Sequence, residues 1–232
     1  MRRFVTASLA GAAICALTTM AGAHIELASG PGFANTTQEI TFGVGHGCAG
    51  MDTLSVRVEI PPGVTSVRTE TSDFGTVAVE TDATGLVSAV TWQKPEASLL
   101  AADTAYYKLT LRLKVPNAPF TTLFFPAHQT CKGPDGGTAT VDWVGTMAAP
   151  DGGGPEPAPT LMILPARTSG WNKFVVPAAV ADLGVYFKDA VIVWKGNAAY
   201  SANAATADLI AHTQDVTKLT SLAANDEIWV KY

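Results

Sequence analysis

The side chains best suited to chemistry in this chain are four histidines and three cysteines. They form no local catalytic pattern with the serines or acids, because the sequence contains no G-x-S-x-G elbow, P-loop or H-E-x-x-H motif. We therefore do not expect an enzyme. Metal binding fits the available residue types better, and it depends on where the mature chain begins.

The first 23 residues have the three parts of a secretory signal peptide. Two arginines precede an uncharged apolar run over 4–17, and Ala21-Gly22-Ala23 is a small-x-small cleavage site. The alternative, a transmembrane anchor, would need about 20 apolar residues, more than this run provides. We predict that residues 1–23 are removed and that the mature protein, which starts at His24, is periplasmic or secreted.

An N-terminal histidine is an unusual metal ligand. Its α-amine and its ring Nδ1 can bind one ion and close a six-membered chelate, which no internal histidine can form. The pKa of the amine is about 8, so a divalent ion displaces its proton readily at neutral pH. Two nitrogens with oxygen ligands suit tetragonal Cu(II), which leads the divalent affinity series. His24 is therefore a candidate copper ligand, unless it merely follows a convenient cleavage site.

Cleavage also removes Cys15 and leaves Cys48 and Cys131 as an even pair in an oxidising compartment. A disulfide is the simplest interpretation, and a thiolate metal site is the alternative. His46 lies two residues before Cys48, so it is either a second nitrogen ligand or a residue packed at a strand end. His128 has the same two interpretations.

From residue 24 to about 165, apolar and polar residues alternate with a period of two, and the elements that must position the candidate residues lie in this range. Val, Ile and Leu alternate there with Thr, Arg, Lys and Glu, which indicates strands with one buried and one wet face. Pro- and Gly-rich turns separate them. The fold class predicted is mainly β, an immunoglobulin-like antiparallel β-sandwich. We expect its strands at 25–27, 39–44, 54–60, 77–80, 86–92, 106–115, 122–125 and 139–144.

Composition divides the rest of the chain. We assign residues 24–148 to the sandwich and the Pro/Gly-rich stretch 149–166 to a linker. Residues 167–232 then form a small C-terminal α+β extension, with strands near 174–176, 190–194 and 227–232 and a helix at 204–211. Three aromatic residues in this extension are expected to be core or docking residues, with a ligand-stacking surface as the alternative: Trp194, Trp229 and Tyr232.

The overall charge excludes one class of partner. The net charge is −5, 15% of the residues are charged, and no basic run occurs, so the chain has no electrostatic footprint for nucleic acid. Hydrophobic residues make up 47% of the sequence, which is enough to bury a core and excludes intrinsic disorder.

An ordered series of motifs over about residues 24–165 resembles the YcnI-like copper-binding proteins. The resemblance implies an exported immunoglobulin-like sandwich, a disulfide between Cys48 and Cys131, and a Cu(II) site on the N-terminal histidine that a carboxylate completes beside a tryptophan. The motifs that carry it are His24-Ile25-Glu26-Leu27, Phe42-x-Val44-x-His46-Gly47-Cys48-x-Gly50-x-x-Thr53, Val58-x-Ile60-Pro61-x-Gly63-Val64, Phe125-Pro126-x-x-Gln129-x-Cys131 and Val141-Asp142-Trp143.

By this resemblance the metal ligands are His24 and Asp103, and Trp143 lies near the metal. Glu26 competes with Asp103 for the carboxylate role because residues i and i+2 share a strand face. His46 is a possible additional ligand. Without the resemblance, Trp143 would be read as a core residue. The sequence also departs from the family pattern, since Asp73-Phe74-Gly75 lacks a tryptophan that relatives often have there.

The function expected is that of a periplasmic Cu(II)-binding protein, a copper chaperone or scavenger that binds one copper through His24. Its partners would be the copper ion and periplasmic or inner-membrane copper-handling proteins. Two alternatives remain: a copper-dependent oxidase or oxygenase, in which His46 would bind the metal, and a metal-free structural or adhesion module. The oligomeric state is open.

Overall fold

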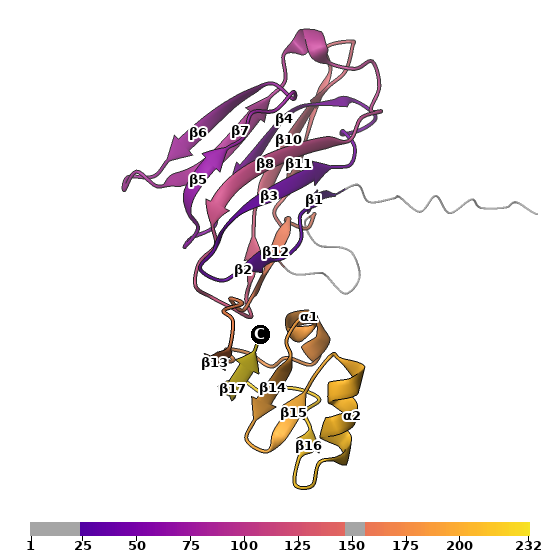
Figure 1. The fold of residues 1–232 in the computed structure, drawn as a ribbon. Helices are drawn as coiled ribbons and strands as arrows, with labels where there is room; N and C mark the ends of the chain where they lie inside the picture. Colours follow the sequence, from indigo (N-terminus) through magenta and orange to yellow (C-terminus); the bar gives the residue numbers. More distant parts are fainter. Residues whose placement is uncertain (1–23, 147–155) are drawn as a thin grey trace, which may run out of the picture.

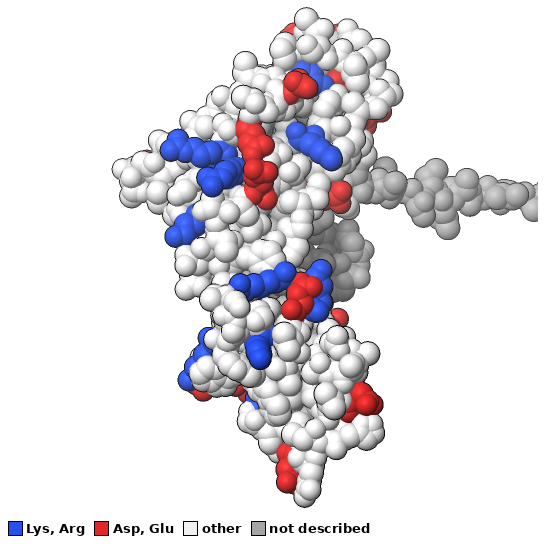
Figure 2. All heavy atoms as spheres, in the orientation of Figure 1, with Lys and Arg blue, Asp and Glu red and all other residues white. Residues whose placement is uncertain are grey.

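The computed structural model describes residues 24–146 and 156–232 (Figure 1). The predicted signal peptide, residues 1–23, lies outside the described residues, as do residues 147–155. No helix within the described ranges is long and apolar enough to cross a membrane. Figure 2 shows acidic and basic side chains interspersed over the face in view, with most of that face formed by other residues.

Most strands of residues 24–146 form two antiparallel sheets that face each other. The four-stranded sheet has the order β1 (Ile25–Leu27), β3 (Thr37–Val44), β8 (Tyr107–Lys114), β5 (Thr65–Thr69). The five-stranded sheet has the order β11 (Thr138–Trp143), β10 (Ala127–Lys132), β4 (Asp52–Glu59), β7 (Val87–Gln93), β6 (Thr76–Thr81). A short 3-10 helix, η1 (Glu96–Ser98), leads into the loop before β8.

The alternation read from the sequence forms the core between these sheets. In β8, Leu109, Leu111 and Leu113 are fully buried. The alternate positions carry exposed Lys108, Arg112 and Lys114 and the half-buried Thr110. Phe42 of β3 packs edge-on against Phe125, with ring centroids 5.5 Å apart. Each buried leucine or phenylalanine contributes about 1.5–3 kcal/mol relative to an exposed one, so this pattern largely determines the sandwich.

The predicted linker 149–166 is wrong in its C-terminal part, because Thr160–Leu164 form strand β12. This strand pairs in parallel with β2 (Gly32–Phe33) and antiparallel with β9 (Thr122–Phe124). Its side chains Leu161 and Ile163 are buried in the sandwich core. The sandwich therefore extends past residue 148. The strand escaped prediction because it is short and directly follows a run of prolines and glycines.

The C-terminal extension has the expected α+β composition. Its sheet has the order β13 (Trp171–Val175), β17 (Glu227–Lys231), β14 (Ile192–Lys195), β15 (Ala198–Tyr200), β16 (Thr217–Lys218). Two helices accompany it, α1 (Leu183–Phe187) and α2 (Ala204–His212). Asn203 caps α2 by accepting a hydrogen bond from the Thr206 N–H at 3.1 Å.

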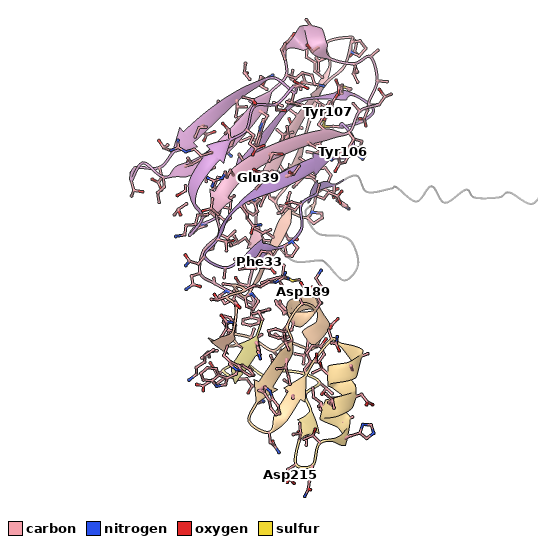
Figure 3. All side chains as sticks on the ribbon, viewed as in Figure 1. Phe33, Glu39, Tyr106, Tyr107, Asp189 and Asp215 are labelled. Carbon is pink, nitrogen blue, oxygen red and sulfur yellow. A yellow bond between two sulfur atoms is a disulfide. The ribbon has the colours of Figure 1, made fainter. Side chains whose placement is uncertain are left out.

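The extension packs onto the sandwich through a second hydrophobic core. Phe120, in the loop between β8 and β9, lies 5.3 Å from the ring of Tyr186 and 5.9 Å from that of Phe187. Beside it, the Arg167 guanidinium lies 4.4 Å from the Phe33 ring centroid and forms an ion pair with Asp189. Figure 3 labels Phe33 and Asp189 on the two sides of this junction.

Candidate metal centre

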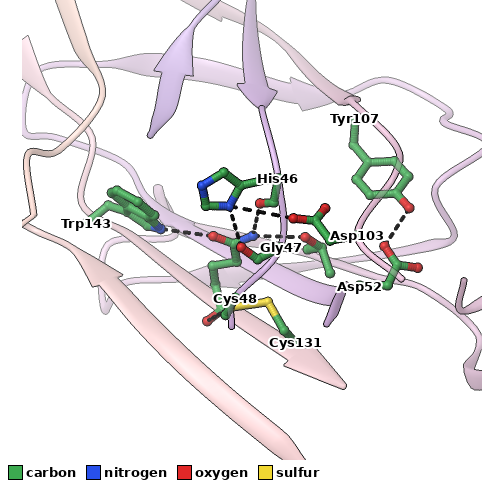
Figure 4. A network of polar contacts seen from close by, with 10 residues as sticks. His46, Gly47, Cys48, Asp52, Asp103, Tyr107, Cys131 and Trp143 are labelled. Carbon is green, nitrogen blue, oxygen red and sulfur yellow. Dashed lines mark hydrogen bonds and ion pairs between the residues drawn. A yellow bond between two sulfur atoms is a disulfide. The ribbon is translucent and has the colours of Figure 1, made fainter. Parts of the chain in front are cut away.

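Cys48 and Cys131 are joined by a disulfide across 83 residues of sequence. The predicted disulfide is confirmed, so these two sulfur atoms are not thiolate ligands. The bond links the loop after β3, which carries His46, to β10 of the opposite sheet (Figure 4). The disulfide therefore holds the loop that carries His46 against β10.

His24 lies against Trp143. Their ring centroids are 5.5 Å apart and the rings are nearly perpendicular, at 85°. His24 directly precedes β1 and is exposed, whereas Trp143 ends β11 and is only 4% exposed. Both β1 and β11 are edge strands of their sheets, and the two edges meet here. Trp143 thus belongs to the core and also contacts the candidate N-terminal ligand.

Gln129 holds Trp143 in place. The indole Nε1–H of Trp143 donates to Gln129 Oε1 at 3.2 Å. The amide of Gln129 in turn donates to the carbonyl of His46 at 2.7 Å and to Thr53 Oγ1 at 2.9 Å. Gln129 is 1% exposed, so its hydrogen bonds form out of water, where an unmade bond is costly. Sequence reasoning assigned this residue no role, although it occurs in one of the family motifs.

His46 is the next candidate along this network. Its Nδ1 lies 3.8 Å from Asp103 Oδ2 and also contacts the carbonyl of Gly47. The His46 side chain is 44% exposed and that of Asp103 is 14% exposed. Figure 4 shows the His46 ring between Trp143 and Asp103. The structure therefore brings His46 and Asp103 together, whereas the resemblance had paired Asp103 with His24.

Strand pairing connects this pair to His24. Ile25 of β1 is opposite Val44 of β3 in an antiparallel pair. The residue before β1, His24, is therefore next to the residue after β3, Gly45. A Cβ at Gly45 would lie 3.9 Å from the His24 carbonyl oxygen. His46 is the following residue, which places its backbone beside the first residue of the predicted mature chain.

Glu26 is exposed on β1, opposite Gly43. Because side chains alternate along a strand, Glu26 lies on the face opposite to buried Ile25. His24 is two residues before Glu26 and is expected on the same face as Glu26. Among the described residues it forms no side-chain hydrogen bond or ion pair. The structure therefore leaves both carboxylates as candidates, Asp103 fixed beside an imidazole and Glu26 free at the strand edge.

A buried polar cluster supports the loop that carries Asp103. Asp52 accepts hydrogen bonds from the Lys94 ammonium at 2.7 Å, the Tyr107 hydroxyl at 2.6 Å and the Leu100 N–H at 2.8 Å. Burial by itself would raise the pKa of Asp52, but these donors outweigh it and hold the pKa below its usual value. Burial and the neighbouring carboxylate raise the pKa of Tyr107. The sequence did not reveal this cluster.

His128 lies elsewhere. It occupies the outer face of β10, and its Nδ1 is 2.6 Å from Asp142 Oδ1. Because side chains alternate along a strand, this face is opposite to the one on which Gln129 meets Trp143. His128 is therefore not part of the candidate site.

The described residues contain no cluster of three or more His, Cys, Asp or Glu side chains that could hold a metal.

Comparisons with known proteins agree with the fold. The family model described as "Domain of unknown function (DUF1775)" matches residues 24–163. A crystal structure of an uncharacterized protein from Nocardia farcinica, reported to have an immunoglobulin-like fold, is 26% identical, with a TM-score of 0.50 over 60% of this chain and 97% of that one. The immunoglobulin-like prediction is thereby confirmed.

Two other comparisons add little. The major pilin subunit BcpA of Bacillus cereus is 10% identical, with a TM-score of 0.37 over 90% of this chain and 55% of the pilin. A search of curated proteins gives no match.

Proposed function

This chain belongs to the DUF1775 family, and on that premise we propose that it is an exported Cu(II)-binding protein that serves as a copper chaperone or scavenger. The observation that carries the proposal is the contact between His24 and Trp143, whose ring centroids are 5.5 Å apart. These residues are far apart in sequence, and each has a role in the copper site implied by the resemblance to YcnI-like proteins.

The proposed nitrogen and oxygen ligands suit Cu(II), a borderline ion that prefers tetragonal coordination. His24 supplies Nδ1 and, after removal of residues 1–23, the α-amine. These two nitrogens favour Cu(II) over the other divalent ions of the first transition row. Copper is the cargo in this proposal, and the protein's part is to bind, orient and release it.

A carboxylate completes the proposed site and offsets the charge of the ion. We favour Asp103, because Gly50 and His46 hold it: its N–H donates to the Gly50 carbonyl at 3.2 Å, and its carboxylate lies 3.8 Å from His46 Nδ1. A fixed ligand loses less conformational entropy on binding than the free side chain of Glu26. His46 then acts as the neighbour that orients Asp103 rather than as a ligand.

Trp143 supports a binding role over a redox role. Its indole is held by Gln129 and lies edge-on to the His24 ring, so it covers one side of the imidazole with apolar surface. Such a neighbour limits the access of water and oxygen to an ion held by His24. His24 as a residue is exposed, and this exposure leaves a route for transfer of the ion to a partner by ligand exchange.

The test uses the mature protein with its first residue verified by mass spectrometry. Cu(II) is titrated while the EPR spectrum is recorded, in parallel with a form that has one glycine before His24. The extra residue blocks the six-membered chelate and leaves every side chain unchanged. We expect weaker binding and loss of the two-nitrogen spectrum in the extended form. Equal affinity in the two forms would contradict the proposal.

Two further variants assign the carboxylate. Asp103→Asn should weaken Cu(II) binding, whereas Glu26→Gln is the matched control and should leave it unchanged. The reverse result would transfer the role to Glu26. Sustained oxidation of ascorbate by the copper-loaded protein, together with nitrogen couplings from His46, would favour the copper-dependent oxidase instead.

A further inference from the structure

The C-terminal sheet carries tryptophans on its outer face. Trp171 is 52% exposed and Trp229 is 45% exposed, and Trp194 is partly exposed beside them. Trp229 was expected to be a core or docking residue, with a ligand-stacking surface as the alternative, and its exposure shows that it is not in the core. Ile228 and Val230 are buried instead, because alternation along β17 directs them to the inner face and Trp229 to the outer one.

The register of three strands aligns these indoles in a stripe. Trp229 of β17 is directly opposite Trp194 of β14. On the other side of β17, Trp229 is opposite Lys173 of β13, and Trp171 is opposite Lys231. Trp171 and Trp229 are thus diagonal neighbours, about 7–8 Å apart at the backbone. The stripe crosses two strand spacings, roughly 10 Å, which is comparable with the length of a disaccharide.

Two lysines alternate with the indoles and hold them. Lys173 Nζ lies 5.7 Å from the Trp229 ring centroid, and Lys231 Nζ lies 5.9 Å from that of Trp171. Contacts of this kind are cation–π interactions, which favour one orientation of the ring. Lys173 also forms an ion pair with Glu227 at 2.7 Å. The face therefore offers flat aromatic surfaces with hydrogen-bond donors and an acceptor between them.

We propose that the indole stripe of Trp171, Trp229 and Trp194 binds a polysaccharide chain. The face of a pyranose ring presents C–H groups with partial positive charge, which complement the negative face of an indole. The hydroxyl groups at the edges of the ring require donors and acceptors, and the lysines and Glu227 supply both. This binding site is separate from the proposed copper site and does not depend on it.

Charge distinguishes this ligand from a membrane. Residues 167–232 contain six Lys and Arg and six Asp and Glu, so the extension carries no excess positive charge. Binding to an anionic bilayer takes clustered basic residues, and Glu227 on the same face would oppose it. A neutral or weakly anionic polysaccharide matches a face with both signs of charge.

Symmetry argues against a second copy of this chain as the ligand. A twofold dimer through this face would bring the same surface against itself. Lys173 and Lys231 lie among the indoles, so the two sets of lysines would be buried close together. Like charges in such an interface cost several kcal/mol, which a polysaccharide avoids.

The test is a depletion assay with the full mature chain. The protein is incubated with purified peptidoglycan, insoluble chitin or microcrystalline cellulose, and in a parallel arm with phosphatidylglycerol vesicles, and the unbound fraction is measured. We expect binding to at least one polysaccharide. Trp171→Ala and Trp229→Ala should each weaken it by about tenfold or more.

Leu209→Ala is the matched control, because Leu209 is 67% exposed on α2 and lies outside the stripe. It should bind as the unmodified chain does. Because both tryptophans are exposed, we expect their replacement to leave the thermal midpoint of unfolding unchanged. An unchanged midpoint will show that the variants fold. Lack of binding to all three polysaccharides would overturn the proposal. Binding to vesicles alone, or polysaccharide binding that survives both tryptophan substitutions, would do the same.

Discussion

Replacement of Gln129 by leucine tests whether the polar network under the candidate site stabilises it. Leucine is similar to glutamine in volume, although it branches one carbon earlier, and it has no polar atoms. The indole N–H of Trp143 and the hydroxyl of Thr53 would lose their partner, and both residues are buried, at 4% and 0% exposure. The carbonyl of His46 would also lose its donor, but His46 is exposed and water can replace that bond.

The expected loss follows from these two groups. A buried donor or hydroxyl without a partner costs about 1–3 kcal/mol, so two cost roughly 2–6 kcal/mol. The greater apolar character of leucine offsets about 1–2 kcal/mol of this. The difference is about 0–5 kcal/mol, and we expect Gln129→Leu to lower the free energy of unfolding by about 2–3 kcal/mol, the middle of that range.

Equilibrium urea unfolding followed by far-UV circular dichroism measures the change, provided that the slope with urea is the same in both proteins. Thr53→Val serves as a graded control, since it removes only one of the hydrogen bonds and should cost about 1 kcal/mol. A loss below about 0.5 kcal/mol for Gln129→Leu, the range of ordinary surface changes, would refute the reasoning.

Three further predictions concern the framework. Lys94→Met should lower the free energy of unfolding by about 3–5 kcal/mol because it leaves the Asp52 carboxylate buried without a charged partner. Urea unfolding should show that the double variant, Lys94→Met with Asp52→Asn, recovers part of this loss. The pKa of Asp52 is lowered in the folded state, so its stabilising effect is present above the unfolded pKa of about 3.9 and is lost as the pH falls through the folded pKa. Between pH 6 and pH 2, the free energy of unfolding should therefore fall more in the unmodified protein than in Asp52→Asn. Replacement of Cys48 and Cys131 by alanine should lower the free energy of unfolding by ~4 kcal/mol, because the disulfide closes a loop of 83 residues; a calorimetric loss below 1 kcal/mol would contradict the loop-entropy account.

Large alternating side chains made part of the fold predictable. The leucines of β8 alternate with polar and charged residues, and the sequence predicted this strand almost to its ends. Strand β10 was missed because its buried residues are Ala127, Gln129 and Cys131, which give no strong hydrophobic period. Strand β5 was missed because none of its residues is fully buried and its register shifts against β8.

The candidate site was predictable only in its separate residues. His24 and Trp143 were named from motifs, and the structure places their ring centroids 5.5 Å apart, which the sequence alone could not show. Gln129 and the Asp52–Lys94 pair were not found, because a buried polar residue looks the same in sequence as an exposed one. No periodicity indicates which partner will satisfy its hydrogen bonds.

The sequence by itself determined which residues alternate along a strand, and it placed a histidine at the predicted cleavage site and two cysteines after that site. These are short-range properties, since alternation along a strand selects a face wherever the strand is placed. The tertiary structure alone decided that the ends of β1 and β11 meet, that Asp103 lies beside His46, and that Trp229 faces outward. Those contacts depend on which strands are neighbours and in what register, and packing of the whole chain sets both.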